Sequence, residues 1–101
     1  MSVFMVLHVP GNPASLEKYA AGPGADIIKR VSAAGKAAGA IRHSFAGSDN
    51  EIVVIDEWPD EKSFQAFFDS QPDIPNIMRE GGAQGQPKVS FYRKLNTMDS
   101  F

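Results

Sequence analysis

The sequence predicts an α+β fold in which four antiparallel strands form one sheet and helices cover one of its faces. The strongest observation is the stretch 51–58, where four β-branched residues stand in a row, as is typical of a buried strand. Pro59 ends this strand because it has no N–H, and Asp60 can cap a helix that begins at once. The Gly-Ser-Asp-Asn run at 47–50 has the composition of a hairpin turn that joins this strand to the preceding one.

The other elements follow from local patterns. Residues 3–9 are nearly all apolar and predict a first strand that is buried on both faces. The segment 13–38 is rich in alanine and charged residues, and the Gly-Pro-Gly at 22–24 divides it into two helices. Alternation in 88–95 predicts the last strand. We therefore expect strands at 3–9, 40–46, 51–58 and 88–95, and helices at 14–20, 25–37, 60–70 and 73–80.

This order, βαββαβ, with short and right-handed connections, predicts a ferredoxin-like sandwich. We expect a single domain over residues 1–95 and a tail over 96–101. The first and third strands are apolar at consecutive positions, so the face without helices must also be covered. Because two-fold homodimers are the commonest assemblies, the expected partner is a second copy that packs sheet to sheet.

Composition narrows the range of functions. The chain has 101 residues, 43% of them apolar, which is enough for a real core, and a net charge of −2 argues against nucleic acid as a partner. It has no cysteine, which excludes disulfides and thiolate chemistry. No apolar run reaches the ~20 residues that cross a membrane, and no basic region precedes the apolar start. A cytoplasmic protein that does not bind membranes is the expectation.

His43 is the first candidate catalytic residue. Strand alternation places it with Ile41 and Phe45 on a covered face. A buried histidine can act as a general base, for example by removing the proton of a phenol. The alternative is a core histidine that only makes structural hydrogen bonds.

Asp56 is the expected partner of this histidine. If Ser48-Asp49 forms the hairpin loop, His43 lies opposite Val54 and Asp56 lies diagonally on the same face. A carboxylate there could fix the imidazole tautomer. A slip of one residue would move Asp56 to the other face.

His8 is the second candidate base. It shares its parity with Phe4 and Val6, so it too could face inward, although a structural histidine at the end of a strand is the alternative. Two histidines without a cysteine or carboxylate at ligand spacing predict no metal site.

Aromatic side chains are the candidates for substrate binding. Trp58, at the strand-to-helix junction, could form the wall of an aromatic pocket or fill the seam between helix and sheet. Phe45 and Phe68 are candidates for the same pocket. Tyr92 could donate to a phenolate or carboxylate, and the alternative is an exposed position with only a cross-strand role. Asp56 and Glu57 are adjacent in a strand, so they point to opposite faces and cannot act on one atom together.

The hairpin into IVVIDEW and the helix after it resemble the dimeric α+β barrel superfamily, and within it the antibiotic biosynthesis monooxygenase-like domain, over roughly residues 3–95. The residues that match at the strand-to-helix junction are Glu57, Trp58, Asp60, Glu61, Phe64, Ala66 and Phe67. The resemblance implies a dimer. Members of this family include oxygenases that need no cofactor. Haem-degrading relatives have an Asn on the first strand and a His on the helix after the Trp, and this chain has neither.

Two functions are therefore expected. The first is a small, cofactor-independent monooxygenase acting on an aromatic or quinol-type molecule, with His43 or His8 as base. The second is a non-catalytic dimeric protein that binds a small ligand or serves as a scaffold. The enzyme needs a cavity of roughly 300 Å³ or more with His43 or His8 at its wall, whereas a scaffold would have that volume filled by Phe and Ile side chains.

Overall fold

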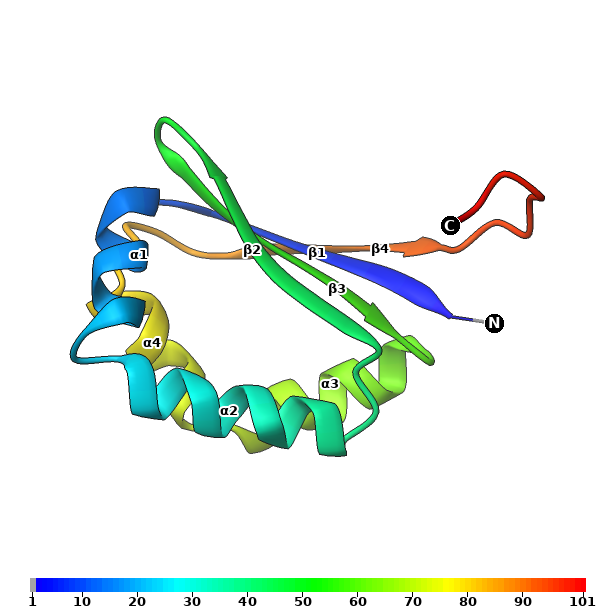
Figure 1. Ribbon diagram of the computed structural model, residues 1–101, viewed down its shortest axis with the longest axis horizontal. Helices are drawn as coiled ribbons and strands as arrows, with labels where there is room; N and C mark the ends of the chain where they lie inside the picture. The colour runs from blue at the N-terminus through cyan, green and yellow to red at the C-terminus, as the bar shows by residue number, and fades with distance from the viewer. Residues whose placement is uncertain (1) are drawn as a thin grey trace.

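The computed structural model describes residues 2–101 and shows, in that part of the chain, four strands and four helices (Figure 1). In chain order these are β1 (Val3–Pro10), α1 (Pro13–Ala21), α2 (Ala25–Ala37), β2 (Arg42–Ser48), β3 (Glu51–Trp58), α3 (Glu61–Ser70), α4 (Asp73–Glu80) and β4 (Lys88–Arg93). The strands form one antiparallel sheet in the order β2-β3-β1-β4. This confirms the ferredoxin-like α+β fold.

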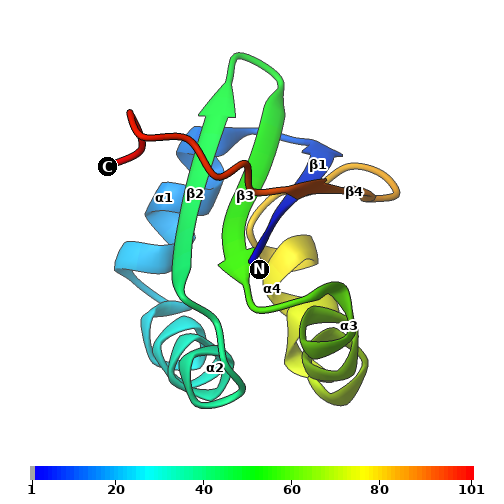
Figure 2. The same ribbon diagram turned by 90° about the vertical axis from the view of Figure 1, so that its right-hand side faces the viewer.

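The helices lie together on one face of the sheet, with α2 under β2 and with α3 and α4 on the other side of the helical layer (Figure 2). The core lies between the two layers, because alternate residues of β1 and β3 point toward the helices. Its buried members are Met5, Leu7, Val9, Leu16, Ile52, Val54, Trp58 and Phe64. None of the helices in the described residues is long and apolar enough to cross a membrane.

The start of α3 and the end of α2 are both capped by residues that their local sequence provides. The carboxylate of Asp60 accepts the backbone N–H of Ser63 at 2.7 Å and so caps α3, as predicted. At the end of α2, Gly39 adopts φ +117°, and the N–H of Ala40 bonds the carbonyl of Gly35 at 3.0 Å. This cap uses residues 39 and 40, so the prediction that β2 begins at residue 40 was wrong by two residues.

The β2–β3 hairpin differs from its predicted register. Ser48 pairs with Glu51, so the loop is Asp49-Asn50 and not Ser48-Asp49. Gly47 belongs to the strand, where it pairs with Ile52, and a Cβ at this position would lie 2.5 Å from Cγ of Pro13 at the start of α1. Packing against Pro13 therefore explains the glycine at position 47, and turn formation does not.

The outer face of the sheet carries no helix (Figure 1). The expectation that β1 and β3 are covered on both faces includes a second copy on this outer face, which the single chain leaves open. Phe4 and Val6 of β1 are only half-buried, and Ile55 of β3 is 43% exposed.

Candidate functional site

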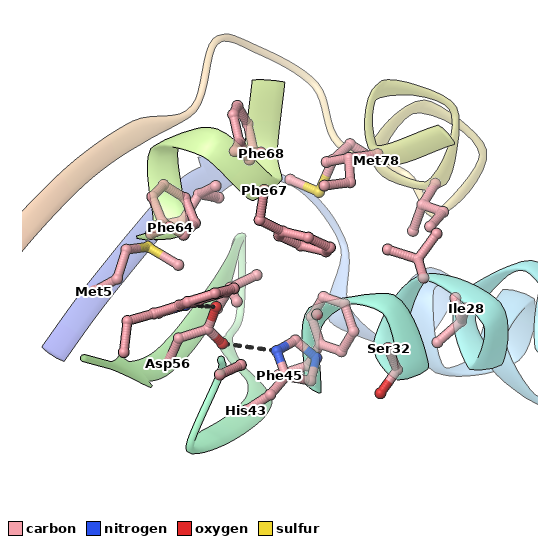
Figure 3. Close-up of a pocket in the computed structure, with 18 residues that line it drawn as sticks. Met5, Ile28, Ser32, His43, Phe45, Asp56, Phe64, Phe67, Phe68 and Met78 are labelled. Carbon is pink, nitrogen blue, oxygen red and sulfur yellow. Dashed lines mark hydrogen bonds and ion pairs between the residues drawn. The ribbon is translucent and has the colours of Figure 1, made fainter. Parts of the chain in front are cut away.

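A cavity of about 110 Å³ lies between the sheet and the helices. Side chains of β1, β2, β3, α2, α3 and α4 line it, and nearly all of them are apolar (Figure 3). His43 and Asp56 are the titratable residues of this lining, which contains neither lysine nor arginine among the described residues. Such a cavity favours an uncharged ligand, because an anionic group would lose its hydration without gaining a cation.

His43 and Asp56 meet at the wall of this cavity. They are direct cross-strand partners, and Nδ1 of His43 lies 2.7 Å from Oδ1 of Asp56. The prediction that the two residues share a face was correct, whereas the diagonal arrangement was not. The corrected hairpin loop moves Asp56 from the diagonal position to the one directly opposite His43.

The contact defines the state of the imidazole. A carboxylate only accepts hydrogen bonds, so Nδ1 of His43 must donate the proton. In the neutral ring Nε2 then carries the free lone pair, which is the atom that a general base uses. The His43 side chain is 39% exposed and that of Asp56 only 9%, so the carboxylate is enclosed while the ring reaches the mouth of the cavity. Phe45 supports the ring by an edge contact with a 5.1 Å centroid distance.

Asp56 has a second partner. The indole N–H of Trp58 donates to Oδ2 of Asp56 at 3.0 Å. Trp58 is 1% exposed, packs on Phe64 and Phe67 and lines the cavity with its ring. The two predicted alternatives for Trp58 are therefore combined, since the ring both fills the seam and faces the cavity. Phe45 and Phe68, the other predicted aromatic contacts, also line the cavity.

His8 and Tyr92 lie elsewhere. Met5, Leu7 and Val9 point toward the helices, so His8, with the opposite parity, lies on the outer face. There Nδ1 of His8 lies 3.4 Å from a carboxylate oxygen of Glu51. The expectation that His8 faces inward was wrong, because both sets of alternate residues in β1 are apolar enough to be buried.

Tyr92 is 56% exposed and is the cross-strand partner of Phe4, so it too lies on the outer face and away from the cavity. Neither His8 nor Tyr92 is among the residues that line the cavity.

Glu57 points away from Asp56, to the outer face, as alternation predicts. It is nevertheless buried, and the hydroxyl of Ser2 donates to its Oε2 at 2.6 Å. Arg42 and Lys94 lie 3.3 and 3.5 Å from its carboxylate oxygens. The hydrogen bond from Ser2 is the largest cause that lowers the pKa of Glu57, and the charges of Lys94 and Arg42 lower it further against the opposing effect of burial.

One side of the cavity was not predicted as part of a site. Ile28, Val31, Ser32 and Gly35 line it from α2. Their spacing of i, i+3, i+4 and i+7 marks one face of a helix, which is the signal that could have identified them. Figure 3 shows Ser32 on the side of the cavity where His43 and Phe45 lie. All three residues are exposed, so the cavity opens there, between α2 and β2.

No family model and no curated protein matches the chain. Several solved structures share its fold. SnoaB, a cofactor-independent oxygenase from Streptomyces nogalater, is 19% identical with a TM-score of 0.60, and the match covers 98% of this chain and 97% of that one. A monooxygenase from the gene ActVA-Orf6 of Streptomyces coelicolor, solved in complex with nanaomycin D, is 20% identical with a TM-score of 0.62, over 98% and 93% of the two chains.

A dimeric ferredoxin-like protein from an uncultured marine organism is 13% identical with a TM-score of 0.64, over 99% of this chain and 93% of that one. At such identities the similarity shows a common fold. The structural neighbours thus include oxygenases and a dimeric ferredoxin-like protein, in agreement with the resemblance of the sequence to the antibiotic biosynthesis monooxygenase-like domain.

Proposed function

We propose that the chain is a small, cofactor-independent monooxygenase that acts on an uncharged phenol- or quinol-type molecule, with His43 as general base. The observation that carries the proposal is the 2.7 Å contact between Nδ1 of His43 and Asp56 at the wall of an apolar cavity. The fold shared with SnoaB and the ActVA-Orf6 monooxygenase supports it.

The proposed reaction needs only the substrate and O₂. Nε2 of His43 takes the hydroxyl proton of the phenol, and the resulting phenolate is electron-rich at its ring carbons. The anion reduces O₂, and a C–O bond forms at the para carbon to give a peroxide, which the protonated His43 neutralises. Loss of the C–H proton and of hydroxide then leaves a carbonyl. One phenol and one O₂ thus give one quinone and one water, and the substrate supplies all the electrons.

The exposed position of His43 suits this role, because a base at the mouth can exchange its proton with solvent between turnovers. The volume of the cavity limits what enters. A cavity of about 150 Å³ holds a benzene ring, so a volume of 110 Å³ has room for at most about one aromatic ring. A larger polycyclic substrate would place one ring inside and the others at the opening between α2 and β2.

The second candidate is a non-catalytic protein that binds a small apolar molecule or acts as a scaffold. The observation that favours it is the cavity volume of about 110 Å³, which is below the roughly 300 Å³ of most small-molecule sites. Aromatic side chains take up much of the space, with Phe64, Phe67 and Phe68 contributed by α3 alone.

We also propose that two copies form a homodimer through their outer sheet faces. Phe4, Val6, Val53 and Ile55 form an apolar centre on the face without helices, and none of them is fully buried in the single chain. A second copy offers a surface of the same kind, as in isologous two-fold interfaces. The dimeric ferredoxin-like structural neighbour supports this assembly.

Oxygen consumption in the presence of uncharged phenols and quinols tests the function, with product identity followed by mass spectrometry. We expect the His43→Ala variant to lose about 100-fold or more in kcat. The matched control is His8→Ala, which removes the histidine of the outer face and should retain kcat within about twofold. Equal losses of kcat in the two variants would refute the role of His43 as base. Binding of the phenols and quinols without any oxygen uptake would favour the non-catalytic protein.

A further inference from the structure

Trp58 makes two kinds of contact, and only one of them involves the cavity. Its ring packs on Phe64 and Phe67, while its indole N–H is used by Oδ2 of Asp56 at 3.0 Å. Because an indole has a single donor, Trp58 has none left for a ligand. The indole N–H of Trp58 therefore serves a hydrogen bond within the protein and is not free to bind a ligand.

The partner of that N–H is the carboxylate that holds His43. Asp56 uses Oδ1 for His43 and Oδ2 for Trp58, so both of its oxygens have a specific donor (Figure 3). Asp56 and Trp58 stand two apart in β3, which places both side chains on the same face of the strand. The rotation of the carboxylate about its Cβ–Cγ bond is thus restrained from one side by a ring that is 1% exposed.

We infer that Trp58 is a positioning residue, which fixes the carboxylate of Asp56 so that Oδ1 faces His43 and holds the ring with its proton on Nδ1 and its lone pair on Nε2. The inference rests on the proposed role of His43 as base, and it assigns Trp58 a task other than binding the substrate. It makes a prediction about the imidazole tautomer that does not depend on turnover.

The Asp56→Asn variant exposes this role, because an amide has one acceptor and one donor group. If the indole N–H keeps its acceptor, the amide oxygen faces Trp58 and the NH₂ group faces His43. Nδ1 must then accept, and the proton moves to Nε2, where it abolishes the basic site. If Trp58 does not direct the side chain, the amide oxygen can face His43 and the tautomer is retained.

The experiment measures the ring nitrogens of His43 by ¹⁵N NMR near pH 8.5, where an ordinary histidine is neutral. The wild type should show Nδ1–H, and Asp56→Asn should show mainly Nε2–H. Adding Trp58→Phe to Asp56→Asn removes the indole donor and should return a clear fraction of Nδ1–H. The control adds Phe67→Leu to Asp56→Asn, which alters packing on the same indole ring but keeps its N–H, and should stay at Nε2–H.

The histidine NMR signals are simple to assign, because the chain has one tryptophan and two histidines, and a His8→Gln background leaves His43 as the single histidine. A tautomer that is the same with and without Trp58→Phe would overturn the inference. So would Nε2–H in the wild type, a measurement that needs no variant and can still refute the inference if the chains that carry Asp56→Asn fail to fold. Oxygen uptake is scored separately, so the expected tautomers without turnover would refute the oxygenase and leave the positioning role in place.

Discussion

His43 and Asp56 face each other directly across β2 and β3, and Nδ1 of His43 lies 2.7 Å from Oδ1 of Asp56. The pair joins an edge strand to a central strand. One partner is enclosed and the other reaches the mouth of the cavity. This asymmetry is what a base needs, because the enclosed carboxylate orients the ring while the free nitrogen remains accessible.

The first prediction concerns this pair. Asp56→Asn should lower kcat for oxygen uptake by about 100- to 10,000-fold, because the amide presents a donor to Nδ1 and produces the unproductive tautomer. KM should change far less, since Asp56 already has both oxygens bonded within the protein. Steady-state kinetics of Asp56→Asn checks this prediction, with Asp69→Asn, a change at an exposed carboxylate of α3, as the control. A loss confined to KM would show instead that Asp56 binds the substrate.

The second prediction follows from the lowered pKa of Glu57. A carboxyl group with a lower pKa in the folded state than in the unfolded state stabilises the fold above the unfolded value, and this stabilisation is lost as the pH falls through the folded value. The wild type should therefore lose its stability advantage over Glu57→Gln as the pH falls below the ordinary value of 4.5.

Urea unfolding at several pH values measures this difference, with Glu17→Gln, an exposed change in α1, as the control. Ser2→Ala should reproduce part of the effect, because its hydroxyl is the main cause of the shift. A constant difference between the wild type and Glu57→Gln across the acid range would contradict the assignment.

The third prediction tests why residue 47 is a glycine. Gly47→Ala should lower the free energy of unfolding by about 1–3 kcal/mol, because the added methyl group would overlap the Pro13 ring. Ala46→Ser, at the next position but on the outer face, should have little effect. Chemical denaturation of both variants provides the comparison. If Gly47→Ala is neutral, contact with Pro13 does not explain the glycine at position 47.

The fourth prediction concerns the outer face. If two copies pack through it, Ile55→Lys should convert the dimer to a monomer, because a charge would be buried between apolar side chains. Light scattering after size-exclusion chromatography gives the mass directly. Ala33→Lys, at an exposed position of α2, should remain dimeric. A wild type that elutes at the mass of one chain would refute the proposed dimer.

Much of the fold could be predicted from local sequence. The β-branched run of β3, the proline that ends it and the Asp60 cap all act over a few residues, so their consequences do not depend on the rest of the chain. The alternation of β3 likewise determined that Asp56 and Glu57 face opposite sides and that Trp58 shares the side of Asp56.

Tertiary packing decided what local patterns left open. In β1 both sets of alternate residues are apolar, so only the position of the helices placed Met5 and Leu7 inside and His8 outside. The Gly-Ser-Asp-Asn run allowed two hairpin loops, and in the structure the loop is Asp49-Asn50, with Gly47 paired to Ile52 in the strand. That choice set the direct pairing of His43 with Asp56. The sequence thus predicted His43, Asp56 and Trp58 and the shared face of His43 and Asp56, while the direct pairing of these two residues and the α2 side of the cavity came from the tertiary structure.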